Sequence, residues 1–180
     1  MQTAPVRLPP LDESDWDPGL EPVLDSLGTV LNVHRMMAHH PELLAAWTPL
    51  RQHITSSGTL SARHRELIIL RAAALAGVAY EWHHHVVRGS GAGIVAAEIE
   101  AVRTGPASVW ADEREAALLA ATDELFQDLA VGDAVWAALI RHFSIPQILD
   151  LIVTVGMYTT LAMFINTTGV QIETETRPVL

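Results

Sequence analysis

Glu81 and His85 stand four positions apart, a spacing that places two side chains on one face of a helix. A carboxylate can orient an imidazole ring, and the ring titrates near neutral pH, so such a pair can donate and accept protons. The same spacing also occurs in surface pairs that stabilise a helix by about 0.2–0.5 kcal/mol. Spacing alone therefore leaves a catalytic and a structural role open.

A second carboxylate, Glu66, precedes this pair on what is expected to be the neighbouring helix. It stands directly before an almost wholly apolar run, residues 67–75. Partial burial disfavours the charged form of a carboxyl group, so we expect a raised pKa for Glu66. Glu66 could then extend a proton relay or bind a substrate in its protonated form.

Three other residues of these segments could contact a substrate. Arg71 could bind a substrate carboxylate with two hydrogen bonds, or form a salt bridge with Glu66 or Glu81. Tyr80 and Trp82 could form the wall of a pocket, or simply pack in the core.

The histidine run 83–85 also raises the question of a metal site. Glu66, Glu81 and His85 could supply three ligands. His83 and His84 point away from His85, because each helical residue turns by about 100°. The three histidines therefore cannot all bind one ion, and we expect a solvated or interface position for His83 and His84.

Helices must position these residues, because apolar residues recur at helical spacing along the chain and strand-like alternation is missing. His34, His39 and His40 fall near a helix end, where histidine interacts favourably with a helix C-terminus. The expected helices cover residues 20–37 (as one helix or two), 41–54, 62–76, 79–88, 94–102, 113–129, 134–142 and 144–167.

About eight helices with short connections predict an all-α fold, a compact multi-helix bundle. The proline-rich residues 1–18 are expected to form an irregular N-terminal arm. Residues 19–172 should form a single domain, and residues 173–180 a C-terminal tail.

The composition excludes several classes of protein. The 180 residues are 49% hydrophobic and 18% charged with a net charge of -10, which is typical of a folded domain and offers no basic face for nucleic acid or anionic lipid. Cysteine is absent, so disulfides, thiolate metal sites and a cysteine nucleophile are excluded. A reducing cytoplasm fits this absence, and residues 1–17 lack the pattern of a signal peptide.

Residues 151–172 carry no charged side chain and are long enough to span a membrane. They also contain several threonines, asparagine and glycine, and no lysine or arginine flanks them. We therefore expect a helix that is buried in the core or in an apolar subunit interface.

Taken in order, several segments resemble the carboxymuconolactone decarboxylase family, which includes the alkylhydroperoxidase-type proteins. The resemblance covers roughly residues 25–172. It rests on residues 65–67 with 70–73, Tyr80-Glu81-Trp82 with His85, residues 40–43 with Trp47, residues 58–60, residues 154–158 and residues 166–170. The resemblance implies a bundle of the alkylhydroperoxidase-like type and a homo-oligomer, either a trimer or a hexamer.

The chain departs from the alkylhydroperoxidase branch at its redox centre. That branch has a glutamate, then a Cys-x-x-Cys pair, then a histidine four residues after the second cysteine. With the histidine on His85 and the glutamate on Glu66, the two cysteine positions hold Val78 and Glu81. Thiol–disulfide exchange needs a thiolate, so thiol peroxidase activity is excluded and acid-base chemistry remains.

The resemblance therefore implies a cytoplasmic lyase, without a metal or other cofactor, that decarboxylates a small carboxylated lactone or unsaturated acid in the catabolism of aromatic compounds. His85 would donate the proton, Glu81 would orient the imidazole ring of His85, and Glu66 would complete the proton relay. Arg71, with Tyr80 and Trp82, would bind the substrate. Two alternatives stay open: an isomerase, hydratase or cyclase of the same family, and a non-catalytic oligomeric binding protein. Nucleic acid and membranes are not expected partners.

Overall fold

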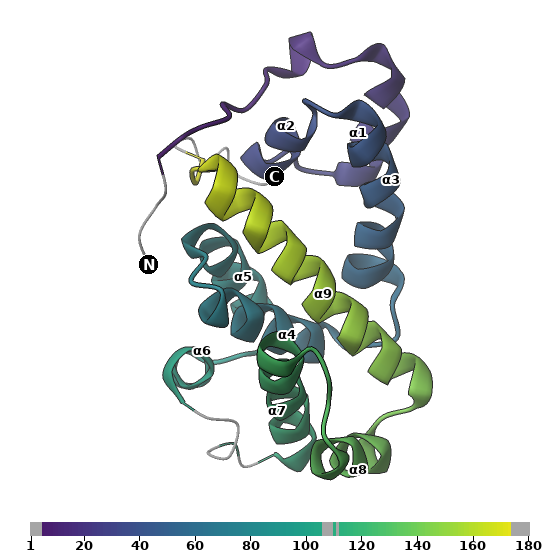
Figure 1. The fold of residues 1–180 in the computed structure, drawn as a ribbon, viewed down its shortest axis with the longest axis vertical. Coiled ribbons are helices and arrows are strands. Elements are labelled where there is room, and N and C mark those ends of the chain that lie inside the picture. Colours follow the sequence, from purple (N-terminus) through teal and green to yellow (C-terminus); the bar gives the residue numbers. More distant parts are fainter. Residues whose placement is uncertain (1–4, 106–109, 111, 174–180) are drawn as a thin grey trace.

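The computed structural model describes residues 5–105, 110 and 112–173, and every regular element in these ranges is helical (Figure 1). The predicted all-α fold is confirmed. The α-helices are α1 (Glu21–Leu27), α2 (Asn32–Met37), α3 (Pro41–Gln52), α4 (Ala62–Leu75), α5 (Ala79–Gly91), α6 (Ala96–Thr104), α7 (Glu113–Asp128), α8 (Asp133–His142) and α9 (Ile145–Thr168). Two 3₁₀ turns, η1 (Glu13–Asp15) and η2 (Pro18–Leu20), and a π-helical turn, η3 (His53–Ser57), complete the described elements.

Helix α4 is the centre of the bundle and contacts α5, α6, α7 and α9. The Ser61 side chain caps its first turn by accepting a hydrogen bond from the backbone N–H of His64 at 3.1 Å. Residues 66–70 are all buried. The helix ends before Gly77, whose φ of 67° lies in the left-handed region that favours glycine. The short connection that follows packs α5 directly against α4.

Helix α9 crosses the whole molecule, with α1 to α3 on one side and α4 to α7 on the other (Figure 1). One apolar core lies between its C-terminal half, α2 and α3, and another lies between its N-terminal half, α7 and α8. A third core joins α4 to α5 and α6. Because α4 and α9 take part in more than one core, they hold the N-terminal helices and the rest of the bundle together.

The N-terminal arm, which was expected to be irregular, contains regular structure. It contains η1 and η2, and Trp16 between them is buried in the core beside α1 to α3. The backbone N–H of Arg7 donates to the carbonyl of Thr168 at 2.7 Å, so the arm passes over the end of α9. The predicted tail, residues 173–180, lies outside the described residues except for Glu173.

One side of α9 is apolar and exposed. The helix is long and apolar enough to cross a membrane, but half of its most apolar window is buried inside the bundle, in agreement with the predicted core position. The α9 outer stripe consists of Ile145, Leu149, Ile152, Val153 and Met163.

Candidate active site

Glu66, Glu81 and His85 meet in the buried space between α4 and α5. The Nδ1 atom of His85 lies 2.6 Å from Oε2 of Glu66, and its Nε2 atom lies 3.3 Å from Oε2 of Glu81. The side chain of His85 is 1% exposed, so water does not compete for these contacts. The two carboxylates thus contact opposite nitrogens of one imidazole ring.

This arrangement decides the charge of the site. Burial alone would lower the pKa of His85, but its hydrogen bonds to Glu66 and Glu81 raise it. Burial alone would raise the pKa of Glu66, but the hydrogen bond from His85 and the charge of Arg65 lower it. The predicted raised pKa of Glu66 is therefore wrong, because the partner on α5 outweighs desolvation. Glu66 is ionised rather than a neutral group for substrate binding.

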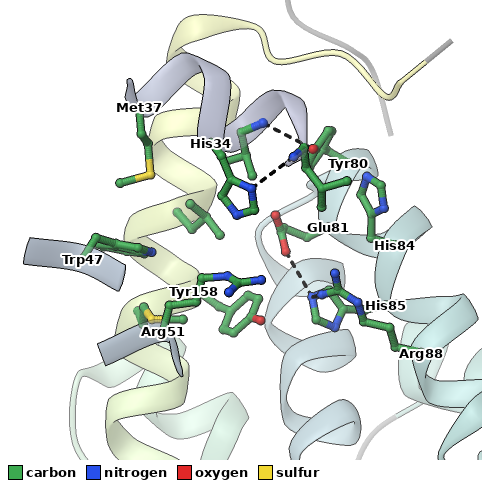
Figure 2. A pocket seen from close by; sticks show the side chains of 14 residues that line it. His34, Met37, Trp47, Arg51, Tyr80, Glu81, His84, His85, Arg88 and Tyr158 are labelled. Carbon is green, nitrogen blue, oxygen red and sulfur yellow. Dashed lines mark hydrogen bonds and ion pairs between the residues drawn. The ribbon is translucent and has the colours of Figure 1, made fainter. Parts of the chain in front are cut away.

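Glu81 and Arg88, the two contacts of His85 Nε2, line a small cavity together with His85, which we call the inner pocket (Figure 2). Its free volume of about 30 Å³ holds one or two water molecules, so a larger ligand must displace side chains. The inner pocket is lined by Leu31, Val33, His34, Met37, Trp47, Arg51, Tyr80, Glu81, His84, His85, Arg88, Met157, Tyr158 and Leu161. One side is thus apolar and the other carries the ionisable groups, as in small-molecule sites.

Arg88 gives His85 a second hydrogen-bonding state. Its Nη1 atom lies 3.2 Å from Nε2 of His85. Guanidinium groups only donate, so this contact suits neutral His85 with a free lone pair on Nε2. The contact with Glu81 suits the protonated ring. His85 therefore has a partner for Nε2 before and after it gives up a proton.

Tyr158 and Arg51 face His85 from the other side of the inner pocket (Figure 2). The Tyr158 ring lies edge-on to His85, with the centroids 5.2 Å apart. Burial and the charge of Glu81 raise the pKa of its hydroxyl, which therefore stays a hydrogen-bond donor. Within the described ranges, neither the Tyr158 hydroxyl nor the Arg51 guanidinium has a hydrogen bond to another side chain or the backbone.

The histidines placed near helix ends act differently from the expectation. His34 Nδ1 accepts a hydrogen bond from the backbone N–H of Leu31 at 3.1 Å, at the start of α2. Burial and the charges of Arg51 and Arg88 lower the pKa of His34 to about 3, so the ring is neutral. His40 likewise accepts from Leu43 N–H at the start of α3. The expected interaction with a helix C-terminus is therefore wrong for His34, whose ring is neutral, and His40 instead caps the start of α3.

Of the three residues predicted to bind a substrate, only Tyr80 lines the inner pocket. Arg71 forms a bidentate salt bridge with Asp123 of α7, at 2.5 and 3.0 Å. Neither of its expected partners, Glu66 of α4 and Glu81 of α5, forms a salt bridge with it. Trp82 packs in the apolar core beside α6. Arg71 and Trp82 are thus structural residues in this fold, and Arg51 and Arg88 are the arginines of the pocket.

The carboxylate of Glu173 binds Tyr80 and His84, two residues that line the inner pocket. Glu173 Oε1 accepts hydrogen bonds from the hydroxyl of Tyr80 at 2.7 Å and from the backbone N–H of Asn32 at 2.6 Å. Its Oε2 atom lies 2.9 Å from Nε2 of His84. Glu173 therefore connects the start of α2 to the start of α5. The sequence carries no signal for this contact, because its partners are 93 and 141 residues away.

The metal alternative does not match this geometry. The carboxylates of Glu66 and Glu81 lie on opposite nitrogens of His85, whereas the ligands of one ion must converge on a single point. In the part of the chain that the structure describes, no cluster of three or more histidine, aspartate or glutamate side chains could hold a metal ion.

The fold has clear relatives among solved structures. The debrominase Bmp8, solved in complex with 2,3,4-tribromopyrrole, is 20% identical over 96% of this chain and 95% of its own, with a TM-score of 0.79. The alkylhydroperoxidase core of an uncharacterised peroxidase-related protein from Ralstonia eutropha is 20% identical over 94% of both chains, with a TM-score of 0.80. A protein of unknown function from Agrobacterium tumefaciens, described as a putative antioxidant defence protein, is 26% identical over 77% of this chain and 96% of its own, with a TM-score of 0.69.

A comparison with the curated proteins found no match. Residues 41–124, which include α4 and α5, match the family model of the carboxymuconolactone decarboxylase family. Glu66, Glu81 and His85 all lie in the matched segment. Together with the alkylhydroperoxidase-like fold, this match supports the resemblance of the chain to the carboxymuconolactone decarboxylase family.

Proposed function

We propose that this protein is a cofactor-independent acid-base enzyme that decarboxylates a small carboxylated lactone or unsaturated acid. The observation that supports this most is the position of His85, buried between two carboxylates with Nε2 at the inner pocket. A raised pKa keeps such a ring protonated near neutral pH, ready to act as a general acid. The family contains enzymes, and this chain has no cysteine for thiol chemistry.

The proposed reaction uses Tyr158, His85, Arg88 and Glu66. The bond to the leaving carboxylate breaks, and its electron pair moves onto a neighbouring carbonyl to give an enolate and carbon dioxide. The Tyr158 hydroxyl donates to the enolate oxygen. His85 then delivers its Nε2 proton to carbon, which restores the carbonyl. Neutral His85 accepts from Arg88 until water replaces the proton, while ionised Glu66 keeps Nδ1–H in place.

A panel of carboxylated lactones and unsaturated acids tests this proposal, with carbon dioxide release and product structure both measured. We expect carbon dioxide from at least one compound, and incorporation of one solvent deuterium at carbon in heavy water. A product of unchanged mass would indicate an isomerase or cyclase instead, and a gain of water would indicate a hydratase. Binding without any turnover would favour the non-catalytic alternative.

Replacing Tyr158 by phenylalanine should reduce kcat about 100-fold, because the enolate oxygen loses its donor in a site that excludes water. The ring that packs on His85 remains, so the melting temperature should stay close to that of the wild type. Steady-state kinetics and thermal unfolding measure the two effects. An unchanged kcat would remove Tyr158 from the mechanism.

We also propose that a second copy of the chain covers the α9 outer stripe, as expected of a cytoplasmic homo-oligomer of this family. Five exposed apolar side chains on one helix face are typical of a subunit contact. Replacing Leu149 and Met163 together by glutamate should lower the native mass measured by light scattering. Replacing the exposed Gln127 by glutamate is the control and should leave the mass unchanged. A wild-type monomer would contradict this proposal.

A further inference from the structure

A second cavity lies on the outer side of Arg51 and Arg88. This outer cavity has a volume of about 360 Å³, which falls in the range of small-ligand sites. It lies between the end of α1, the turn η3 and the start of α4. It is lined by Asp25, Ser26, Leu27, Gly28, Arg51, Thr55, Ser56, Arg65, Glu66 and Arg88. Arg51 and Arg88 also line the inner pocket, so the two cavities adjoin at these side chains.

Two of the three arginines of the outer cavity, Arg51 and Arg88, form no ion pair with a carboxylate among the described residues. Arg65 Nε lies 3.5 Å from Oε1 of Glu66, and Glu66 is already bound to His85. Arg88 contacts only the neutral form of His85. Among residues 5–105, 110 and 112–173, no carboxylate forms an ion pair with Arg51 or Arg88. Two neighbouring guanidinium groups thus face a cavity without a partner.

Arg51 is the more unusual of the pair. Half-buried charged groups are normally paired, because desolvation without a partner destabilises the fold. Burial and the charge of Arg88 both act on Arg51, and they lower its pKa. A protein keeps such a residue when a ligand supplies the missing charge. The surrounding side chains are mostly polar, with Leu27 the one large apolar residue among those that line the cavity.

We infer that Arg51 and Arg88 bind a carboxylate group of the substrate at the boundary between the outer cavity and the inner pocket. The position beside His85 rests on the proposed function, whereas anion binding itself does not. The bound carboxylate is the one that stays in the product. An ion pair to the leaving carboxylate would stabilise the ground state and slow the loss of carbon dioxide. The substrate body then reaches the apolar side of the inner pocket, past Nε2 of His85.

Benzoate and benzamide test the inference directly, because they share size and shape but differ in charge. Calorimetry and thermal unfolding should show that benzoate binds and raises the melting temperature, and that benzamide does not. Replacing Arg51 by glutamine should weaken benzoate binding about tenfold or more, as expected for a charge-assisted pair. Replacing Asp25 by asparagine removes the opposing charge at the rim and should strengthen binding.

The control is Arg103→Gln, which removes the same charge from an exposed position on α6 and should leave benzoate binding unchanged. Ligand-free Arg51→Gln should melt at the same or a higher temperature than the wild type, which separates lost binding from lost folding. Equal binding of benzoate to wild type and Arg51→Gln, or no binding of benzoate to the wild type, would overturn the inference.

The same variants separate this inference from the proposed function. If Arg51→Gln loses benzoate binding but no acid releases carbon dioxide, the anion site stands and the decarboxylase proposal fails. If the enzyme turns over an acid and Arg51→Gln leaves its KM unchanged, the decarboxylase proposal stands and the anion site fails.

Discussion

Replacing His85 by asparagine should reduce kcat by about 10²- to 10⁴-fold, the usual contribution of a general acid. Asparagine can still donate a hydrogen bond to Glu66 from near the position of Nδ1, but it has no proton to deliver to carbon. The remaining activity should lose its dependence on pH in the range where His85 titrates. Both effects are measured by steady-state kinetics over a series of pH values, with a carboxylic acid that the wild type decarboxylates as the substrate.

His83→Asn provides the matched control, because His83 lies on the same helix with its side chain exposed. It should keep full activity and the pH profile of the wild type. Benzoate binding should persist in His85→Asn, since the proposed carboxylate contacts come from Arg51 and Arg88. If a folded His85→Asn protein kept the kcat of the wild type, the assignment of His85 as the general acid would be wrong.

Replacing Glu66 by glutamine should have the second largest effect, a fall in kcat of about 100-fold or more. An uncharged amide no longer holds the imidazolium ring, and loss of an orienting carboxylate is costly in comparable acid-base sites. The high-pH limb of the kcat profile should also move to lower pH. Glu66 raises the pKa of His85 in the wild type, so without this charge the acid loses its proton sooner as the pH rises.

The free energy of unfolding gives an independent check on this pair. The raised pKa of His85 stabilises the fold below the ordinary value of 6.5, and this stability is lost as the pH rises through the raised pKa. The lowered pKa of Glu66 stabilises the fold above 4.5, and this stability is lost as the pH falls through the lowered pKa. The stability difference between wild type and Glu66→Gln should therefore be largest between about pH 4.5 and 6.5. A difference that does not vary with pH would argue against the pair.

The helical spacing in the sequence was enough to predict the fold class and the Glu81–His85 face. Residues four apart must share a face, and a short break at Gly77 must bring α5 back along α4. The contact between Glu66 and His85 needed the family resemblance, because 19 residues separate them. The direction of the Glu66 pKa shift could not be predicted, since it depends on the distance to His85 and not on burial alone.

The arginines show why the remaining residues of the site could not be predicted from the sequence. Arg71 stands on the same helix as Glu66, but its partner Asp123 lies 52 residues further on, in α7. Arg51 stands in a segment with no catalytic motif, and the packing of α3 against α9 brings it to the inner pocket that His85 also lines. The spacing of residues in the sequence and the helical period show which residues share a face of one helix, but not which helix that face contacts. Which faces of distant helices meet is decided by the packing of the three cores.

The position of Glu173 has a consequence for the order in which the molecule is made. A chain leaves the ribosome from its N-terminus, and its domains can begin to fold during synthesis. The start of α2 and the start of α5 are made well before the carboxylate that joins them through Asn32, Tyr80 and His84. The helices can therefore begin to assemble on the nascent chain, while this link between α2 and α5 forms only when translation has passed Glu173.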